Sequence, residues 1–144
     1  MRIDAAVSGA VACGGALGAL ARHGLGVLFP AAPPAFPWTT LVINTLGCLL
    51  IGALVGWLVA SAPHRLAGPF LSTGALGGFT TFSAFAVDVE ALVHLGRPGT
   101  AVAYLVATPA LALSAVFAGT ALIRRVRPAP PAPPAEDVPT ERTR

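Results

Sequence analysis

Polar side chains and phenylalanines gather in one glycine-rich stretch, LSTGALGGFTTFSAF, at residues 71–85. Thr81 and Ser83 supply hydroxyl donors beside Phe82 and Phe85, whose spacing by three places both rings on one face of a helical turn. The edge of a phenyl ring is electropositive, so ring edges and hydroxyl groups together could stabilise an anion. The alternative, that this phenylalanine face only packs in a core, stays open.

Three polar residues outside that stretch have the chemistry to extend such a path. Asn44 lies in an apolar run, INTLGCLLIG, where an unpaired buried amide would cost roughly 2–7 kcal/mol. It therefore either bonds to a neighbouring helix or donates its NH2 group to a passing anion. Tyr104 and Thr108 are four residues apart and share one helical face, so with Asn44 they could form a track of hydrogen-bond donors.

Arg22 is the one basic residue near the end of the first apolar run. Its side chain either extends to the membrane surface to reach water or forms an electropositive vestibule that attracts anions. The three histidines lie near the ends of different apolar runs, so they do not have the spacing of metal ligands. The sequence also shows no nucleophile–base pair, phosphate loop or pair of catalytic carboxylates, so we do not expect an enzyme.

The backbone of the same glycine-rich stretch is a second kind of candidate site. Gly74, Gly77 and Gly78 fall within five positions, and each glycine weakens a helix interior by about 1 kcal/mol relative to alanine. We therefore expect the helix to break at these glycines. Lipid cannot satisfy the freed peptide groups, so a break at membrane depth must be buried in protein or line an aqueous path.

The composition shows that the elements holding these residues are membrane spans. Of the 144 residues, 55% are hydrophobic and only 10% are charged, and the mean hydropathy is +0.76. Soluble domains carry about 25% charged residues, so we expect an all-α integral membrane protein. The net charge of +3 comes largely from the C-terminal end and does not indicate a nucleic-acid partner.

Four apolar runs are each long enough to cross the hydrocarbon core, which takes about 20 residues. The loops between them are short, and Trp38 marks one membrane interface. The proline-rich remainder, residues 128–144, should be disordered, which leaves residues 1–127 as a single four-helix transmembrane domain. The expected spans cover about residues 5–29, 38–60, 66–95 and 100–123.

Arginine positions give little indication of orientation. Four spans place both termini on one side, and an excess of arginine there favours cytoplasmic termini. The excess depends on the three arginines that follow the last span, so a subunit of this kind could insert either way round. Two pairs of glycines with small-xxx-small spacing, Gly14 with Gly18 and Gly52 with Gly56, permit close helix contact. We expect these pairs to lie between subunits, although packing within one subunit is the alternative.

Three segments together resemble the CrcB/Fluc fluoride channel family. They are GGALGALARH at residues 14–23, NTLGCLLIG at residues 44–52 and GALGGFTTFSAF at residues 74–85. Their order and their placement in the first three spans make the combination specific. The resemblance covers the four-span body, roughly residues 5–123, and leaves out the tail.

The resemblance implies an antiparallel, dual-topology homodimer in the cell membrane, with two fluoride pores and a third helix broken near its middle. The break would hold a central structural sodium ion through the backbone carbonyls of Gly77 and Thr80. Fluoride would pass Asn44 and the paired rings of Phe82 and Phe85, beside which the residues themselves place the hydroxyls of Thr81 and Ser83 on the path. The implied polar track on the fourth helix begins at Tyr104 and continues at Thr108.

This sequence departs from the family pattern at a few positions. Ala112 occupies the next place on the polar track and has no hydroxyl, while Ser114 falls off that face. His23 stands where tyrosine is common, and Ala84 replaces a frequent threonine.

Two other functions remain as alternatives. A small proton-coupled drug or cation transporter would also have four spans, but it needs a carboxylate deep in the membrane, and the first span carries only Asp4 at its edge. A non-conducting assembly subunit would use Asn44 and the glycines for packing alone. The function we expect is passive export of fluoride. The expected partners are fluoride, membrane lipid and a second copy of the chain.

Overall fold

The computed structural model describes residues 4–31, 35–61 and 63–126, so the tail expected to be disordered lies outside the described residues. All regular structure in the described residues is helical. Four segments are long and apolar enough to cross a membrane, which confirms the expected all-α, four-span architecture. The helices are α1 (Ala5–Leu28), α2 (Trp38–Ala60), the π-helix η1 (Pro69–Leu76), α3 (Gly77–Phe79), α4 (Phe82–His94) and α5 (Pro98–Val126).

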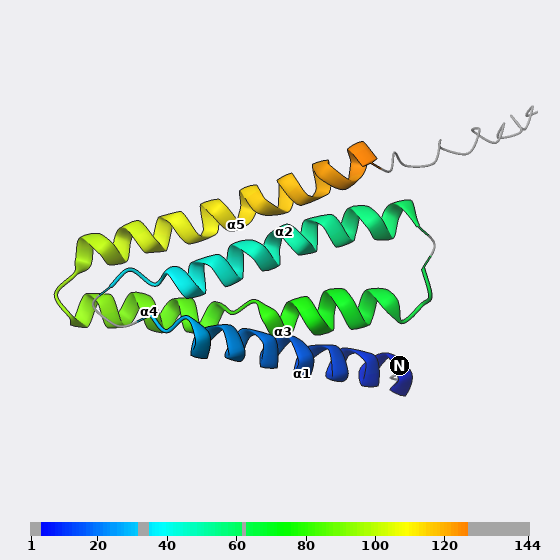
Figure 1. The fold of residues 1–144 in the computed structure, drawn as a ribbon, viewed down its shortest axis with the longest axis horizontal. Coiled ribbons are helices and arrows are strands. Elements are labelled where there is room, and N and C mark those ends of the chain that lie inside the picture. The colour runs from blue at the N-terminus through cyan, green and yellow to red at the C-terminus, as the bar shows by residue number, and fades with distance from the viewer. Residues whose placement is uncertain (1–3, 32–34, 62, 127–144) are drawn as a thin grey trace, which may run out of the picture.

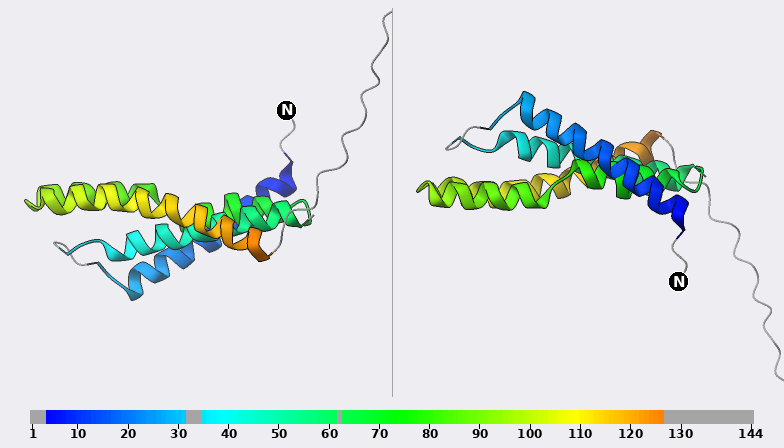
Figure 2. Two further views of the ribbon diagram at one scale, coloured as in Figure 1. Left: turned by 90° about the horizontal axis from the view of Figure 1, so that it is seen from above. Right: turned by 90° about the horizontal axis from the view of Figure 1, so that it is seen from below.

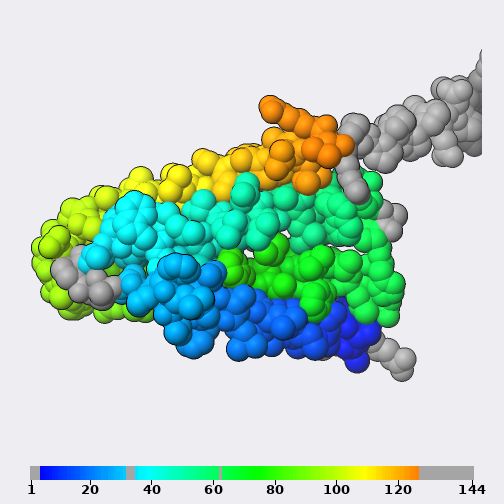
Figure 3. Space-filling model, in the orientation of Figure 1, coloured from blue at the N-terminus to red at the C-terminus, as the bar shows by residue number. Residues whose placement is uncertain are grey.

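The four spans lie side by side in the order α1, third span, α2, α5 (Figure 1). η1, α3 and α4 together make the third span, Pro69–His94. The space-filling view shows the third span between α1 and α2 on one face of the molecule (Figure 3). The start of α1 and the end of α5 lie at the same end of the bundle, as an even number of spans requires (Figure 1).

Glycines on α1 allow it to cross the third span at backbone contact (Figure 2). Gly14 and Gly18 are both buried. A Cβ at Gly14 would overlap the Phe70 carbonyl oxygen of η1, and a Cβ at Gly18 would overlap the Ala75 carbonyl oxygen. Gly52 of α2 approaches the backbone of Val116 on α5 in the same manner. The expectation that these glycine pairs lie between subunits is therefore wrong, because they pack helices of one chain.

The third span is interrupted at Thr80 and Thr81, where the backbone is extended. Thr80 has φ −77° and ψ 154°, and Thr81 has φ −147° and ψ 121°. The break was expected at the glycines, but Gly74, Gly77 and Gly78 all remain helical. Those glycines serve contact with α1, since a Cβ at Gly78 would overlap the Gly15 carbonyl.

One ion pair joins the start of α1 to the connection between α2 and η1. Arg65 donates to the Asp4 carboxylate at 2.6 Å, and Asp4 also caps α1 by accepting the Ala6 N–H. These two hydrogen bonds lower the pKa of Asp4 below its usual 3.8, the arginine being the larger cause. Both side chains are about half exposed, so water screens the pair and its contribution to stability is small.

Candidate functional site

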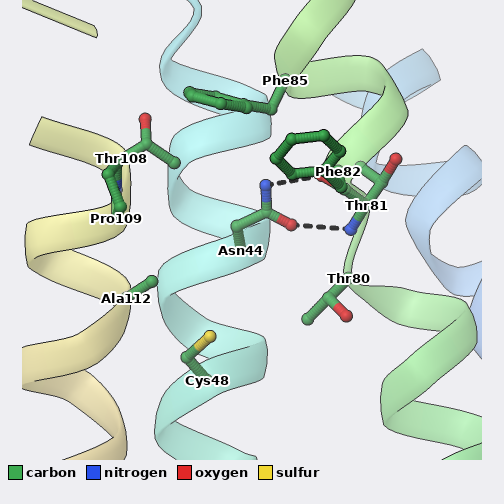
Figure 4. Close-up of a pocket in the computed structure, with 9 residues that line it drawn as sticks. All are labelled: Asn44, Cys48, Thr80, Thr81, Phe82, Phe85, Thr108, Pro109 and Ala112. Atoms are coloured by element: carbon green, nitrogen blue, oxygen red, sulfur yellow. Dashed lines mark hydrogen bonds between the residues drawn. The ribbon is translucent and has the colours of Figure 1, made fainter. Parts of the chain in front are cut away.

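Asn44 on α2 stabilises the break in the third span by hydrogen bonds to its backbone. Its Oδ1 accepts the Thr81 N–H at 2.8 Å, and its Nδ2 donates to the Thr81 carbonyl at 2.9 Å (Figure 4). The amide thus satisfies both polar groups of a peptide unit that has left the helix, and Asn44 is only 8% exposed. One of the two Nδ2 hydrogens is used in this pair, which leaves the second for another acceptor.

Arg22 on α1 reaches back to the other side of the same break. Its Nε donates to the Gly78 carbonyl at 3.2 Å, and the side chain is partly buried. A cation at the C-terminal end of a helix is favourable because the last carbonyls carry partial negative charge. The simple interpretation of Arg22 as a side chain that only extends to the membrane surface is therefore wrong.

Thr81 begins α4. Its Oγ1 accepts the Ala84 N–H at 3.1 Å, which satisfies one of the free donors of the first helical turn. The Ser83 hydroxyl lies 3.2 Å from the same Oγ1. The two hydroxyls expected beside the phenylalanines, those of Thr81 and Ser83, are therefore close together. Their hydrogen bonds to each other and to the Ala84 N–H lie at the start of α4.

Two carbonyls at the break lose the donor that a continuous helix would provide. The Thr81 N–H, which would reach Gly77, goes to Asn44 instead. The Ala84 N–H, which would reach Thr80, goes to the Thr81 hydroxyl. Within the part of the chain that the structure describes, the carbonyls of Gly77 and Thr80 thus lack these helical donors and can bind another electropositive group.

A cavity of about 260 Å³ lies where the break faces α2 and α5 (Figure 4). The ring centroids of Phe82 and Phe85 are 5.7 Å apart there. Phe85 is 8% exposed, whereas Phe82 is 80% exposed. Thr108 is 5% exposed and its hydroxyl has no hydrogen-bond partner among the described residues. No lining side chain carries a formal charge; the lining comprises Asn44, Cys48, Thr80, Thr81, Phe82, Phe85, Thr108, Pro109 and Ala112.

Tyr104 lies one turn before Thr108 but does not line this cavity. Tyr104 is fully buried, and its ring centroid lies 5.2 Å from that of Phe85. Its hydroxyl donates to the Asp88 carboxylate at 3.2 Å. Nothing in the sequence indicates that Asp88 takes part, because only the packing of α4 on α5 brings it to Tyr104. The next expected position of the track, Ala112, faces the cavity, and Ser114 lines a separate groove between α2 and α5.

A second cavity, of about 350 Å³, adjoins the break on the side of α1. Arg22 and His23 line it, together with Thr39 and Thr40 from the start of α2. Thr81 lines both this cavity and the one that contains the phenylalanines. Within the described ranges no group of three or more histidine, cysteine or acidic side chains is placed to hold a metal ion.

Comparisons with known proteins find similarity over most of the chain. Residues 9–120 match the family described as "CrcB-like protein, Camphor Resistance (CrcB)". A Streptomyces coelicolor protein named fluoride-specific ion channel FluC 1 is 46% identical over 126 residues, which are 87% of this chain and 82% of that protein. A Paracoccus denitrificans protein named fluoride-specific ion channel FluC is 49% identical over 109 residues, 76% of this chain and 87% of that protein.

These matches span most of the chain and include all four spans. The named relatives are ion channels, which are not enzymes. With four helices that can cross a membrane, the chain is a multi-pass membrane protein. It belongs to the CrcB-like family.

Proposed function

We propose that this protein is a fluoride-selective channel that exports fluoride passively and so protects the cell from fluoride toxicity. The observation that carries the proposal is the uncharged cavity at the break, where Asn44, Phe82, Phe85 and Thr108 meet. The relatives named as fluoride-specific ion channels support the choice of ion.

The chemistry of the cavity suits a small, strongly hydrated anion. Fluoride must exchange water for other donors, and here these are the free Nδ2 hydrogen of Asn44, the Thr108 hydroxyl and the ring edges of Phe82 and Phe85. No lining group is cationic, so the anion is not held too tightly to leave. We place Tyr104 behind this path, where it positions Phe85 by ring contact.

The functional unit we propose is an antiparallel, dual-topology homodimer with two pores. Phe82 is 80% exposed in the single chain although it lines the cavity. A second copy would cover this ring and complete the wall of each pore. The near balance of arginines on the two sides of the membrane is consistent with insertion in both orientations.

A structural sodium ion at the centre of that dimer is a further part of the proposal. The carbonyls of Gly77 and Thr80 fit it, because both lack the donor of a continuous helix. Carbonyl oxygens present partial negative charge, which suits a cation and not fluoride. The ion would neutralise oxygen atoms that would otherwise be buried without partners where two copies meet.

Fluoride efflux from liposomes that contain purified protein tests the proposed function. We expect rapid efflux, measured with a fluoride electrode under a potential clamped by an ionophore, and much slower efflux when chloride replaces fluoride. Liposomes without protein provide the baseline. Folded protein that releases no more fluoride than this baseline would overturn the proposal.

A proton-coupled transporter is the second candidate, and Asp88 is the observation in its favour. This carboxylate is partly buried in α4 and hydrogen-bonded to Tyr104. It lines a small cavity beside the connection between α1 and α2, which places it away from the break. A channel will conduct fluoride in both directions whatever the pH gradient, whereas flux that an imposed proton gradient drives uphill would favour the transporter.

A further inference from the structure

Close contact between α2 and α5 fixes which of their residues lie level with one another. Gly52 meets the backbone of Val116, and one turn further along both helices Gly56 meets the Thr120 carbonyl, so the two helices run in the same direction. The Thr120 hydroxyl also donates to the Gly52 carbonyl at 3.1 Å. The register between the two helices is therefore set by backbone contact on one side of the break.

The same register continues into the cavity that contains the phenylalanines. Cys48 lies one turn before Gly52 and is level with Ala112, and Asn44 lies one turn earlier and is level with Thr108 (Figure 4). All four of these side chains line the cavity. Asn44 keeps a free Nδ2 hydrogen, and the buried Thr108 hydroxyl has no partner among the described residues, so the first level offers a donor from each helix.

At the second level α5 offers no donor, because Ala112 has a methyl group where the polar track would need a hydroxyl. Thr80 of the third span also lines the cavity, but its hydroxyl donates to the Leu76 carbonyl at 3.0 Å. Cys48 is a half-buried free thiol, and an S–H group is a weak hydrogen-bond donor. A buried cysteine commonly serves only as a small packing residue, but this one borders open space.

We propose that the Cys48 thiol is a further donor of the fluoride path and takes the place of the hydroxyl that Ala112 lacks. This inference rests on the proposed function. The line of donors crosses from α5 to α2, from Thr108 at one level to Cys48 at the next. Because a thiol donates weakly, it lets the anion move on instead of trapping it.

Fluoride flux in liposomes tests the exchange of donors between the two helices. One net hydrogen bond corresponds to a factor of roughly two to ten, so Cys48→Ala should lower flux roughly two- to tenfold. Cys48→Ser, which has a stronger donor, should conduct better than Cys48→Ala. Adding Ala112→Ser to Cys48→Ala should restore most of the lost flux, because a hydroxyl returns to the same level from the other helix.

Cys13→Ser is the matched control, since Cys13 is exposed on α1 and does not line the cavity, and it should retain wild-type flux. Wild-type flux in Cys48→Ala would overturn the inference. A loss of flux that Ala112→Ser fails to restore would also overturn it, because that is the result of a role in packing alone.

A second measurement needs no transport. The chain has two cysteines, so in the Cys13→Ser protein Cys48 is the only thiol. Added fluoride that accepts its hydrogen bond should lower the infrared stretching frequency of the S–H group, and chloride at the same concentration should lower it less. An unchanged S–H band would refute the donor even if the channel conducts. If the band shifts and the liposomes release no fluoride, the channel function fails and the donor site stands.

Discussion

Asn44 has a structural role at the break and a proposed role in conduction. Its amide forms two hydrogen bonds to the Thr81 peptide, and the remaining Nδ2 hydrogen is free for an anion. The residue could be recognised from the sequence because an amide in an apolar run must have a partner. Its partner could not, because Thr81 lies on another helix and only the tertiary fold brings the two together.

Substituting Asn44 with aspartate should damage both roles. The second carboxylate oxygen would face the Thr81 carbonyl, so a hydrogen bond becomes a repulsion, and we expect a loss of roughly 1–3 kcal/mol in the free energy of unfolding. Fluoride flux should fall by at least about tenfold, since that factor corresponds to only 1.4 kcal/mol. Val42→Ala, at a 53% exposed position on the same helix, should change neither. Normal stability and flux in Asn44→Asp would remove the residue from the site.

The two phenylalanines should respond differently to mutation. Phe85 is 8% exposed and packs on Tyr104, so Phe85→Ala should lower the free energy of unfolding by about 3–5 kcal/mol. Phe82 is 80% exposed in the single chain, so Phe82→Ile should cost less stability than Phe85→Ala while it reduces fluoride flux. Thermal unfolding and liposome flux measured on the same preparations separate the two effects. If Phe82→Ile conducts as well as wild type, that ring is not part of the path.

At the scale of the helices, sequence patterns located the spans well because hydropathy and length determine them. The sequence pattern singles out the glycines of the third span as helix breakers, and this expectation is wrong. Intrinsic propensity suggested that Gly77 and Gly78 would break the helix, but backbone contact with α1 keeps them helical. The break falls at Thr80 and Thr81 because side chains from α1 and α2 satisfy the peptide groups around it. Single-helix propensity cannot indicate such partners.

Close contact between α1 and the third span makes a matched pair of substitutions informative. Gly18→Ala should push α1 away from η1, because the new methyl group would overlap the Ala75 carbonyl. We expect destabilisation by about 1–3 kcal/mol, the usual cost of overpacking. Gly9→Ala on the same helix has open space around it and should be neutral or stabilising by up to about 1 kcal/mol. Equal effects of the two substitutions, by thermal unfolding in detergent, would contradict the packing account.

For the whole molecule, sodium should link stability to assembly. If the Gly77 and Thr80 carbonyls hold the ion between two copies, replacing sodium with a large organic cation should lower the thermal midpoint and favour monomers. A ligand present at about 100 times its dissociation constant stabilises the bound state by about 2.7 kcal/mol. Scanning calorimetry and light scattering in matched salts would measure both effects. A midpoint that is the same in both cations would argue against the ion.

The surface ion pair at the start of α1 gives a pH expectation for the whole protein. The pKa of Asp4 is lowered in the folded state by Arg65, so its contribution is complete above the ordinary value of 3.8 and is lost as the pH falls below it. Asp4→Asn should therefore reduce the fall in the thermal midpoint that acidification from about pH 5 to about pH 3 produces. An equally large fall in the variant would contradict this contribution of Asp4.

The attachment of the break to α1 and α2 also implies an order of assembly. The interrupted conformation depends on Arg22 at the Gly78 carbonyl and on Asn44 at the Thr81 peptide. In lipid without these partners, the exposed peptide groups would favour an unbroken helix. During synthesis the two earlier spans emerge first, so they are already in the membrane when the third arrives. The chain order thus supplies the partners before the segment that needs them, and a rearranged gene encoding the third span ahead of them would produce a straight helix that must break later.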